Sequence, residues 1–246
     1  MTQLAMPHRT VRGQIRYTSK KPGLEDMVRG GEWFSFTHHG DGSVILNAHC
    51  EIAEPDPVVM RDIIYAIGPD GRPRNCHVHL MVGDRFMGSG WFGIDAREDG
   101  GTIQCESNGP GIGRLSQRID YVGPIDGFGT HPIAGDAYMT RCMDLSRGPH
   151  ARTIRCFLPS PDHRGATPPM AAEVTIDLEY KGEESVTVAA GTFDCRRFAF
   201  VDRGAMGGNQ HPAYDMWVTA DDDAVFVQGG VGGYMATWYE LIALER

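Results

Sequence analysis

Apolar and polar residues alternate with a period of two through most of the chain. In segment 44–52, valine, leucine, alanine and cysteine occupy even positions, while asparagine, histidine and glutamate lie between them. The same alternation recurs in 76–82 and 174–180. Because successive side chains of a strand point to opposite faces, each segment predicts a strand with one apolar and one polar face.

Other segments are rich in β-branched and aromatic residues, which favour strands. They are 32–38, 58–67, 86–94, 102–107, 185–189, 192–201, 214–219, 224–228 and 234–244. Turn-forming glycine, aspartate and proline separate the strands at 40–42, 69–71, 98–101, 181–183 and 221–223. This spacing predicts an all-β, mainly antiparallel fold, either a single curved sheet or a lipocalin-like barrel.

One part of the chain breaks the alternation. Residues 108–132 are rich in glycine and proline, and 135–146 predict a short helix with Asp136 as its N-cap. We expect 108–146 to form an ordered lid over an opening, with a flexible surface connection as the alternative. Since no low-complexity linker follows, residues 1–246 are predicted to form one β-barrel-like domain that ends in a meander over 172–245.

Composition narrows the class of protein. The chain has 23 Lys+Arg against 32 Asp+Glu, a net charge of −9, which argues against a nucleic-acid partner. No apolar run approaches the ~18 residues of a membrane helix, and the start shows no signal-peptide pattern. Six scattered cysteines without a Cys-x-x-Cys pair predict reduced thiols. We therefore expect a soluble cytoplasmic protein without a membrane partner.

Familiar catalytic motifs give no assignment. Residues 88–93 match G-x-G-x-x-G by letters, but a strand end and a turn follow where dinucleotide binding needs a helix. The chain has no Walker sequence, no G-x-S-x-G and no H-E-x-x-H.

The histidines are the strongest candidates for chemistry. His77 and His79 share one face of a predicted strand, as do His49 and Glu51 on another, each opposite an apolar face. Neither polar face carries lysine, which favours a polar-lined cavity over the alternative of solvent-exposed strand histidines. Imidazole beside a carboxylate can act as a general acid–base pair, so these four residues are the predicted catalytic set.

A metal site is the alternative chemistry for the same pair. A His-x-His strand is similar to the cupin arrangement, but the glutamate expected a few residues later is missing, and Asp84 ends the run after His79. We therefore predict no metal and no cofactor, and keep a metal-dependent hydrolase or oxygenase as an alternative.

Substrate-binding candidates lie on neighbouring segments. Arg61 and Tyr65 share a strand face and are suited to an anionic or phenolic group, although an edge strand with amphipathic side chains would show the same pattern. Aromatic and histidine side chains nearby complete the set: Trp33, His38, Trp91, Tyr138 and His131.

The last third of the chain carries a resemblance. Residues 180–195 contain Val-Thr-Val-Ala-Ala-Gly-Thr-Phe, and a Trp-Val strand and Tyr-Glu-Leu follow at 217–218 and 239–241. This resembles a family of bacterial open β-barrel, lipocalin-like proteins of unassigned function, with Ala189 in place of the usual proline. The resemblance covers under a third of the chain. It implies a curved antiparallel sheet with a ligand-sized hollow and carries no catalytic residues.

Three functions follow as expectations. The first is a cofactor-independent lyase or isomerase acting on a small hydrophobic molecule, expected to be aromatic, in a barrel cavity. The second is a non-catalytic binding protein for a lipid or other apolar ligand, which twelve methionines and many aromatic residues would suit. The third is the metal-dependent enzyme above. A homodimer is a possible assembly for each.

Overall fold

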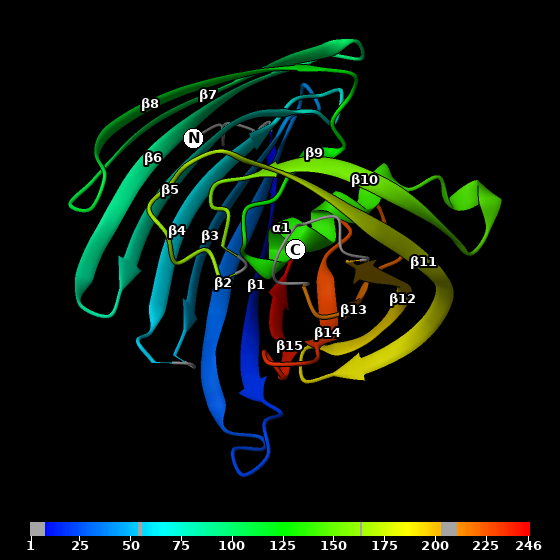
Figure 1. Cartoon of the computed structure of the whole chain (residues 1–246). Helices are drawn as coiled ribbons and strands as arrows, with labels where there is room; N and C mark the ends of the chain where they lie inside the picture. The colour runs from blue at the N-terminus through cyan, green and yellow to red at the C-terminus, as the bar shows by residue number, and fades with distance from the viewer. Residues whose placement is uncertain (1–7, 54–55, 163, 203–210) are drawn as a thin grey trace, which may run out of the picture.

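The structure is a computed structural model that describes residues 8–53, 56–162, 164–202 and 211–246. These residues form one 15-stranded sheet in the order β8-β7-β6-β5-β4-β3-β2-β1-β15-β14-β13-β12-β11-β10-β9. All neighbours pair antiparallel except β9 and β10, which are parallel. The predicted all-β curved sheet is confirmed, and Figure 1 shows the sheet curling around its own inner face.

The first half of the sheet is a meander of eight strands. They are β1 (His8–Ser19), β2 (Val28–His39), β3 (Val44–Ile52), β4 (Val59–Ile67), β5 (Pro73–Val82), β6 (Arg85–Ala96), β7 (Gly100–Gly109) and β8 (Gly113–Val122). A middle segment contains β9 (Gly127–Phe128), α1 (Ile133–Met139) and two 3-10 turns (Thr140–Cys142 and Leu145–Arg147).

The second half is a meander of six strands. They are β10 (His150–Leu158), β11 (Ala172–Val188), β12 (Gly191–Val201), β13 (Tyr214–Thr219), β14 (Phe226–Val231) and β15 (Thr237–Glu245). Pairing of β15 with β1 joins the two meanders into one sheet.

The two halves share one core on the inner face. Its largest fully buried rings come from both meanders and from β9: Phe36, Phe92, Phe128, Phe157, Phe198 and Phe226. The alternation seen in the sequence explains this, because every second residue of β4, for example, is buried while its neighbours are partly or fully exposed.

Helix α1 lies inside the curl (Figure 1) and packs against β13 and β14. Its first two N–H groups, those of Ile133 and Ala134, donate to the Glu32 carboxylate of β2 at 2.7 and 2.9 Å. A buried acid from a distant strand therefore occupies the place that a local N-cap would take. The predicted Asp136 N-cap is wrong: Pro132 precedes the helix, and Asp136 lies in its first turn.

Two further predictions from the sequence are wrong, one in the expected lid and one in β11. Residues 113–122 were expected in the lid over 108–146, but they form the edge strand β8. Only the segment after β8 lies inside the curled sheet (Figure 1). The turn predicted at 181–183 is absent, because β11 runs on through a bulge at Tyr180/Gly182, where Gly182 has φ +116°.

Candidate functional site

The predicted catalytic histidines lie on the outer face of the sheet. His77 and His79 are exposed, and their neighbours Cys76, Val78 and Leu80 fill the inner face. The expectation that they line an interior cavity is wrong, because burial of the apolar positions forces alternate residues outward. His49 and Glu51, with side chains 35% and 42% exposed, lie on the same outer face.

Cross-strand register nevertheless brings the outer residues together. Trp33, His49, Asp62 and His79 are successive partners across β2 to β5. In the adjacent row, Ile64, His77 and Trp91 are partners across β4 to β6. The sequence therefore selected a real cluster, which we call the outer patch, but it borders a shallow open depression rather than a cavity.

Polar groups of the outer patch satisfy one another. His49 Nδ1 lies 2.6 Å from Asp62 and its Nε2 lies 3.1 Å from Glu51. Partial burial lowers the pKa of His49, but the hydrogen bonds to Asp62 and Glu51 outweigh it and raise the pKa above its ordinary value. The imidazole is thus held as a surface ion-pair partner.

Arg61 and Tyr65 lie on the inner face, separated from the histidines by the sheet. Arg61 Nη2 donates to the carbonyl oxygens of Arg164 and Gly165 at 2.7 and 2.9 Å. Tyr65 packs against Phe128 with ring centroids 6.2 Å apart. The prediction that these two residues lie in one site with the histidines is therefore wrong. Arg61 and Tyr65 are among the alternate residues of β4 that are buried on the inner face.

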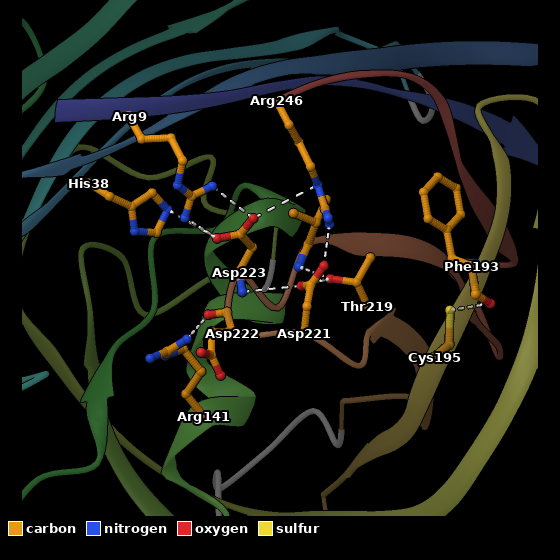
Figure 2. Close-up of polar contacts among 11 residues, drawn as sticks. Arg9, His38, Arg141, Phe193, Cys195, Thr219, Asp221, Asp222, Asp223 and Arg246 are labelled. Carbon is orange, nitrogen blue, oxygen red and sulfur yellow. Dashed lines mark hydrogen bonds and ion pairs between the residues drawn. The ribbon is translucent and has the colours of Figure 1, made fainter. Parts of the chain in front are cut away.

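His38 and Tyr138 occupy a third place, beside the loop between β13 and β14. Figure 2 shows Arg9, His38 and Arg246 arranged around Asp223. His38 Nε2 lies 3.6 Å from Asp223, and Arg9 donates to both carboxylate oxygens of Asp223 at 3.0 and 2.5 Å. Tyr138 stacks on Phe36 nearby. This cluster ties the ends of the chain to one loop.

An interior cavity of about 170 Å³ lies between the inner face and α1. Strands of both halves line it, with Asp136 on the helix side and Arg61 and His131 also at its border. These two are the residues of the predicted binding set that reach the cavity. It is smaller than the outer depression of about 760 Å³, but it is less open to solvent and is lined by both halves of the sheet and by α1.

Asp136 is the acid in the cavity lining, and its side chain is partly accessible from the cavity. Among the described residues, none donates a hydrogen bond to its carboxylate. Burial raises the pKa of Asp136 well above its usual range, the nearby Glu32 carboxylate adds to this, and Arg61 opposes it.

Tyrosine side chains form much of the wall opposite α1. Tyr239 makes edge-on contacts with Tyr17 and Tyr214, with ring centroids 5.0 and 5.9 Å apart. The Tyr214 hydroxyl is buried and has no hydrogen-bond partner among the described residues. Burial raises the pKa of Tyr214 well above its usual range, so this hydroxyl keeps its proton and can donate.

Glu32 accepts hydrogen bonds from the N-terminus of α1 and so holds the helix in place. Besides the two helix N–H groups, its carboxylate accepts a hydrogen bond from the Tyr17 hydroxyl at 2.8 Å. Burial raises the pKa of Glu32 to about 7, although these three donors and Arg61 lower it.

Glu32, Asp136 and Tyr214 were not among the candidates from the sequence. One signal was available for Glu32, which shares the apolar phase of β2 with Phe34 and Phe36, where an acid is buried. No comparable pattern marks Asp136, because a seven-residue helix gives little periodicity.

Over the described ranges, no three His, Cys, Asp or Glu side chains lie close enough together to hold a metal ion. The His77–His79 pair of the metal-dependent alternative therefore has no third ligand there. None of the helices among the described residues has the length and apolar character needed to cross a membrane.

Comparisons with known proteins define the fold only. No family model matches the chain, and no curated protein matches it. It is similar to the crystal structure of a β-barrel-like protein of the domain of unknown function DUF1849 from Brucella abortus, with a TM-score of 0.63 and 12% identity over 97% of both chains. A structure described as a "putative lipoprotein" from Parabacteroides distasonis gives a TM-score of 0.33 and 10% identity over 96% of this chain and 95% of the other.

Proposed function

We propose that this protein is a non-catalytic binding protein that holds a small, largely apolar molecule with one polar group in the interior cavity. The observation that carries the proposal is the combination of apolar walls with two polar groups, the buried Tyr214 hydroxyl, which has no hydrogen-bond partner among the described residues, and the Asp136 carboxylate, to which no described residue donates. Buried polar groups are normally hydrogen-bonded, and a bound ligand would supply the missing partner.

The cavity fits a ligand of about one aromatic ring. Its volume of about 170 Å³ is close to that of an apolar cavity of ~150 Å³ that accepts benzene. Several lining side chains are adaptable or aromatic, including Met139, Met235 and Phe200. This supports a single-ring molecule or a short aliphatic chain rather than a large lipid.

Acid–base catalysis by the histidines receives no support from this geometry. His77 and His79 would have to act on a molecule held on the other side of the sheet from them. The proposal therefore contains no catalytic step, and the lyase or isomerase of the first hypothesis is not part of it.

A binding experiment with a filled cavity tests the proposal. Toluene, phenol and benzyl alcohol serve as probes in ligand-observed NMR and calorimetry. Val174 lines the cavity, so Val174→Phe should occupy it and abolish binding. Val122 is 86% exposed on the edge strand, and Val122→Phe is the matched control that should bind as the wild type does.

The outcome is decided by the difference between the two variants. Binding to the wild type and to Val122→Phe, with loss in a folded Val174→Phe, supports the interior site. If none of the probes binds the wild type, or if both variants bind equally, the proposed function fails. Circular dichroism of each variant confirms that the sheet is retained.

A further inference from the structure

We propose that the polar group of this ligand is an ammonium group, with the Asp136 carboxylate as its counter-ion and the Tyr214 hydroxyl as a second hydrogen-bond partner. This inference rests on the proposed function and names the chemical class of the ligand. It is argued from the partners of each charged group around the cavity and from the walls.

Asp136 is the charged group of the cavity that lacks a donor. The Glu32 carboxylate accepts three hydrogen bonds, from Tyr17, Ile133 and Ala134. The Arg61 guanidinium donates to two backbone carbonyls and lies 3.4 Å from the Cys50 sulfur. Arg61 is therefore held by neutral acceptors and does not reach Asp136, which leaves the Asp136 carboxylate open toward the cavity.

The charges that act on the Asp136 carboxylate favour a cation. Arg164, His131 and His211 also line the cavity, but they are not among the groups that shift the pKa of Asp136. Glu32 and Asp136 are two acids within electrostatic reach of each other, and Arg61 is the base that acts on both. When both acids are ionised, the three groups carry one excess negative charge. An ammonium ligand cancels this charge and provides N–H donors, whereas a carboxylate ligand adds a third negative charge.

A neutral alcohol is the closest competitor for the site. Its hydroxyl can exchange one hydrogen bond with Asp136, but it supplies no positive charge that would favour the ionised carboxylate. Hydrogen bonds between charged partners are roughly twice as strong as neutral ones. Burial raises the pKa of Asp136 in the empty cavity, and a bound ammonium would reverse that effect.

The aromatic walls suit the same ligand. Tyr17, Tyr214 and Tyr239 line the cavity together with Phe200. Aromatic rings attract cations through their π faces, and cages of such rings are used to hold ammonium groups. The volume accommodates one ring with an aminomethyl group, which makes benzylamine a fitting probe.

Three single-ring probes of similar size test the inference at pH 7.5: benzylamine as the cation, benzyl alcohol as the neutral compound and benzoate as the anion. Calorimetry should show that the wild type binds benzylamine about ten- to a hundredfold more tightly than benzyl alcohol. Benzoate should be the weakest of the three.

Two substitutions locate the preference. Asp136→Asn keeps the size of the side chain but removes its charge, and should reduce the preference for benzylamine over benzyl alcohol to within about threefold. Tyr214→Phe should weaken benzylamine binding by about threefold or more, through the loss of one hydrogen bond. Asp84→Asn, at an exposed position in the β5–β6 turn, is the matched control and should behave like the wild type.

The result separates this inference from the proposed function. Equal affinity for benzylamine and benzyl alcohol, or a preference that survives in Asp136→Asn, overturns the ammonium assignment while the binding protein stands. If none of the probes binds, both fail. Asp136→Asn is expected to fold, since it replaces a partly accessible acid, to which no described residue donates, by a neutral amide of the same size. Circular dichroism checks this.

Discussion

At the scale of single residues, the two acids of most interest lie among apolar side chains on the inner side of the sheet. Glu32 is 1% exposed and alternates with Phe34 and Phe36, yet it is fully supplied with donors. Asp136 is the opposite case, an acid in the cavity lining to which no described residue donates a hydrogen bond. One acid therefore organises the interior, and the other is left available to a ligand.

Glu32 should make stability depend on pH. Its carboxyl pKa rises from an ordinary 4.5 to about 7 on folding, so the folded state holds a proton that the unfolded state releases. Stability should therefore fall as pH rises from about 4.5 to about 7, by up to about 3 kcal/mol from this group. Urea unfolding at pH 5 and pH 8 measures the difference.

The variant Glu32→Gln identifies the source of this dependence. A glutamine has one acceptor oxygen where the helix N–H groups and Tyr17 need two, so the variant should lose about 1–3 kcal/mol at pH 8. It should also show a flatter profile between pH 5 and 8. An unchanged slope in Glu32→Gln would assign the pH effect to another group.

At the scale of elements, glycines determine where strands bend and how closely they approach. Gly30 lies at a bulge of β2 opposite Tyr17/Thr18, with φ +142°. A Cβ atom there would lie 1.9 Å from the carbonyl oxygen of Glu51. The bulge places the adjacent Arg29 inward, where its Nη1 donates to Met235 and Thr237.

Gly30→Ala should destabilise the protein by about 2–4 kcal/mol, because it combines an unfavourable φ with a backbone clash. Gly111 lies in the β7–β8 turn with open space around it, so Gly111→Ala should change stability by less than about 0.5 kcal/mol. Chemical denaturation of both variants gives the comparison. Equal effects would show that the bulge tolerates a side chain.

At the scale of the whole molecule, the two ends of the chain are joined twice. Strand β1 pairs with β15, and the Asp221–Asp223 loop gathers Arg9 from β1 and Arg246 from the C-terminus (Figure 2). Asp223 is 7% exposed and holds Arg9 with two hydrogen bonds. These contacts stabilise the seam between the two meanders.

Asp223→Ala should therefore cost about 1–3 kcal/mol, since it leaves Arg9 and Arg246 without their shared partner. Glu98 is 90% exposed in its pair with Arg72, and Glu98→Ala is the control, expected within about 0.5 kcal/mol of the wild type. Thermal unfolding of the two variants is the measurement. A larger loss for Glu98→Ala would contradict the role given to the seam.

Much of the fold followed from the period-two pattern, and the exceptions have identifiable causes. In strand β1 the buried alternate positions hold Val11, Ile15 and Tyr17, but Gly13 lies between them and has no side chain to bury. The ring of Phe34 fills that place, 2.3 Å from where a Cβ would lie, so the core is complete without a side chain. Edge strand β8 is partly exposed on both faces, which leaves it little hydrophobic contrast.

By itself, the sequence determined which residues share a face, because the side-chain period of a strand is fixed by its backbone. That placed His77 with His79 on one strand face and His49 with Glu51 on another. Only the tertiary structure decided how these faces lie: the sheet curls around its apolar face, which leaves the histidine faces outside, and cross-strand register brings them side by side. The same curl brings Asp136 and Tyr214 to the wall of one cavity and places Glu32 within electrostatic reach of both, through contacts that no local pattern encodes.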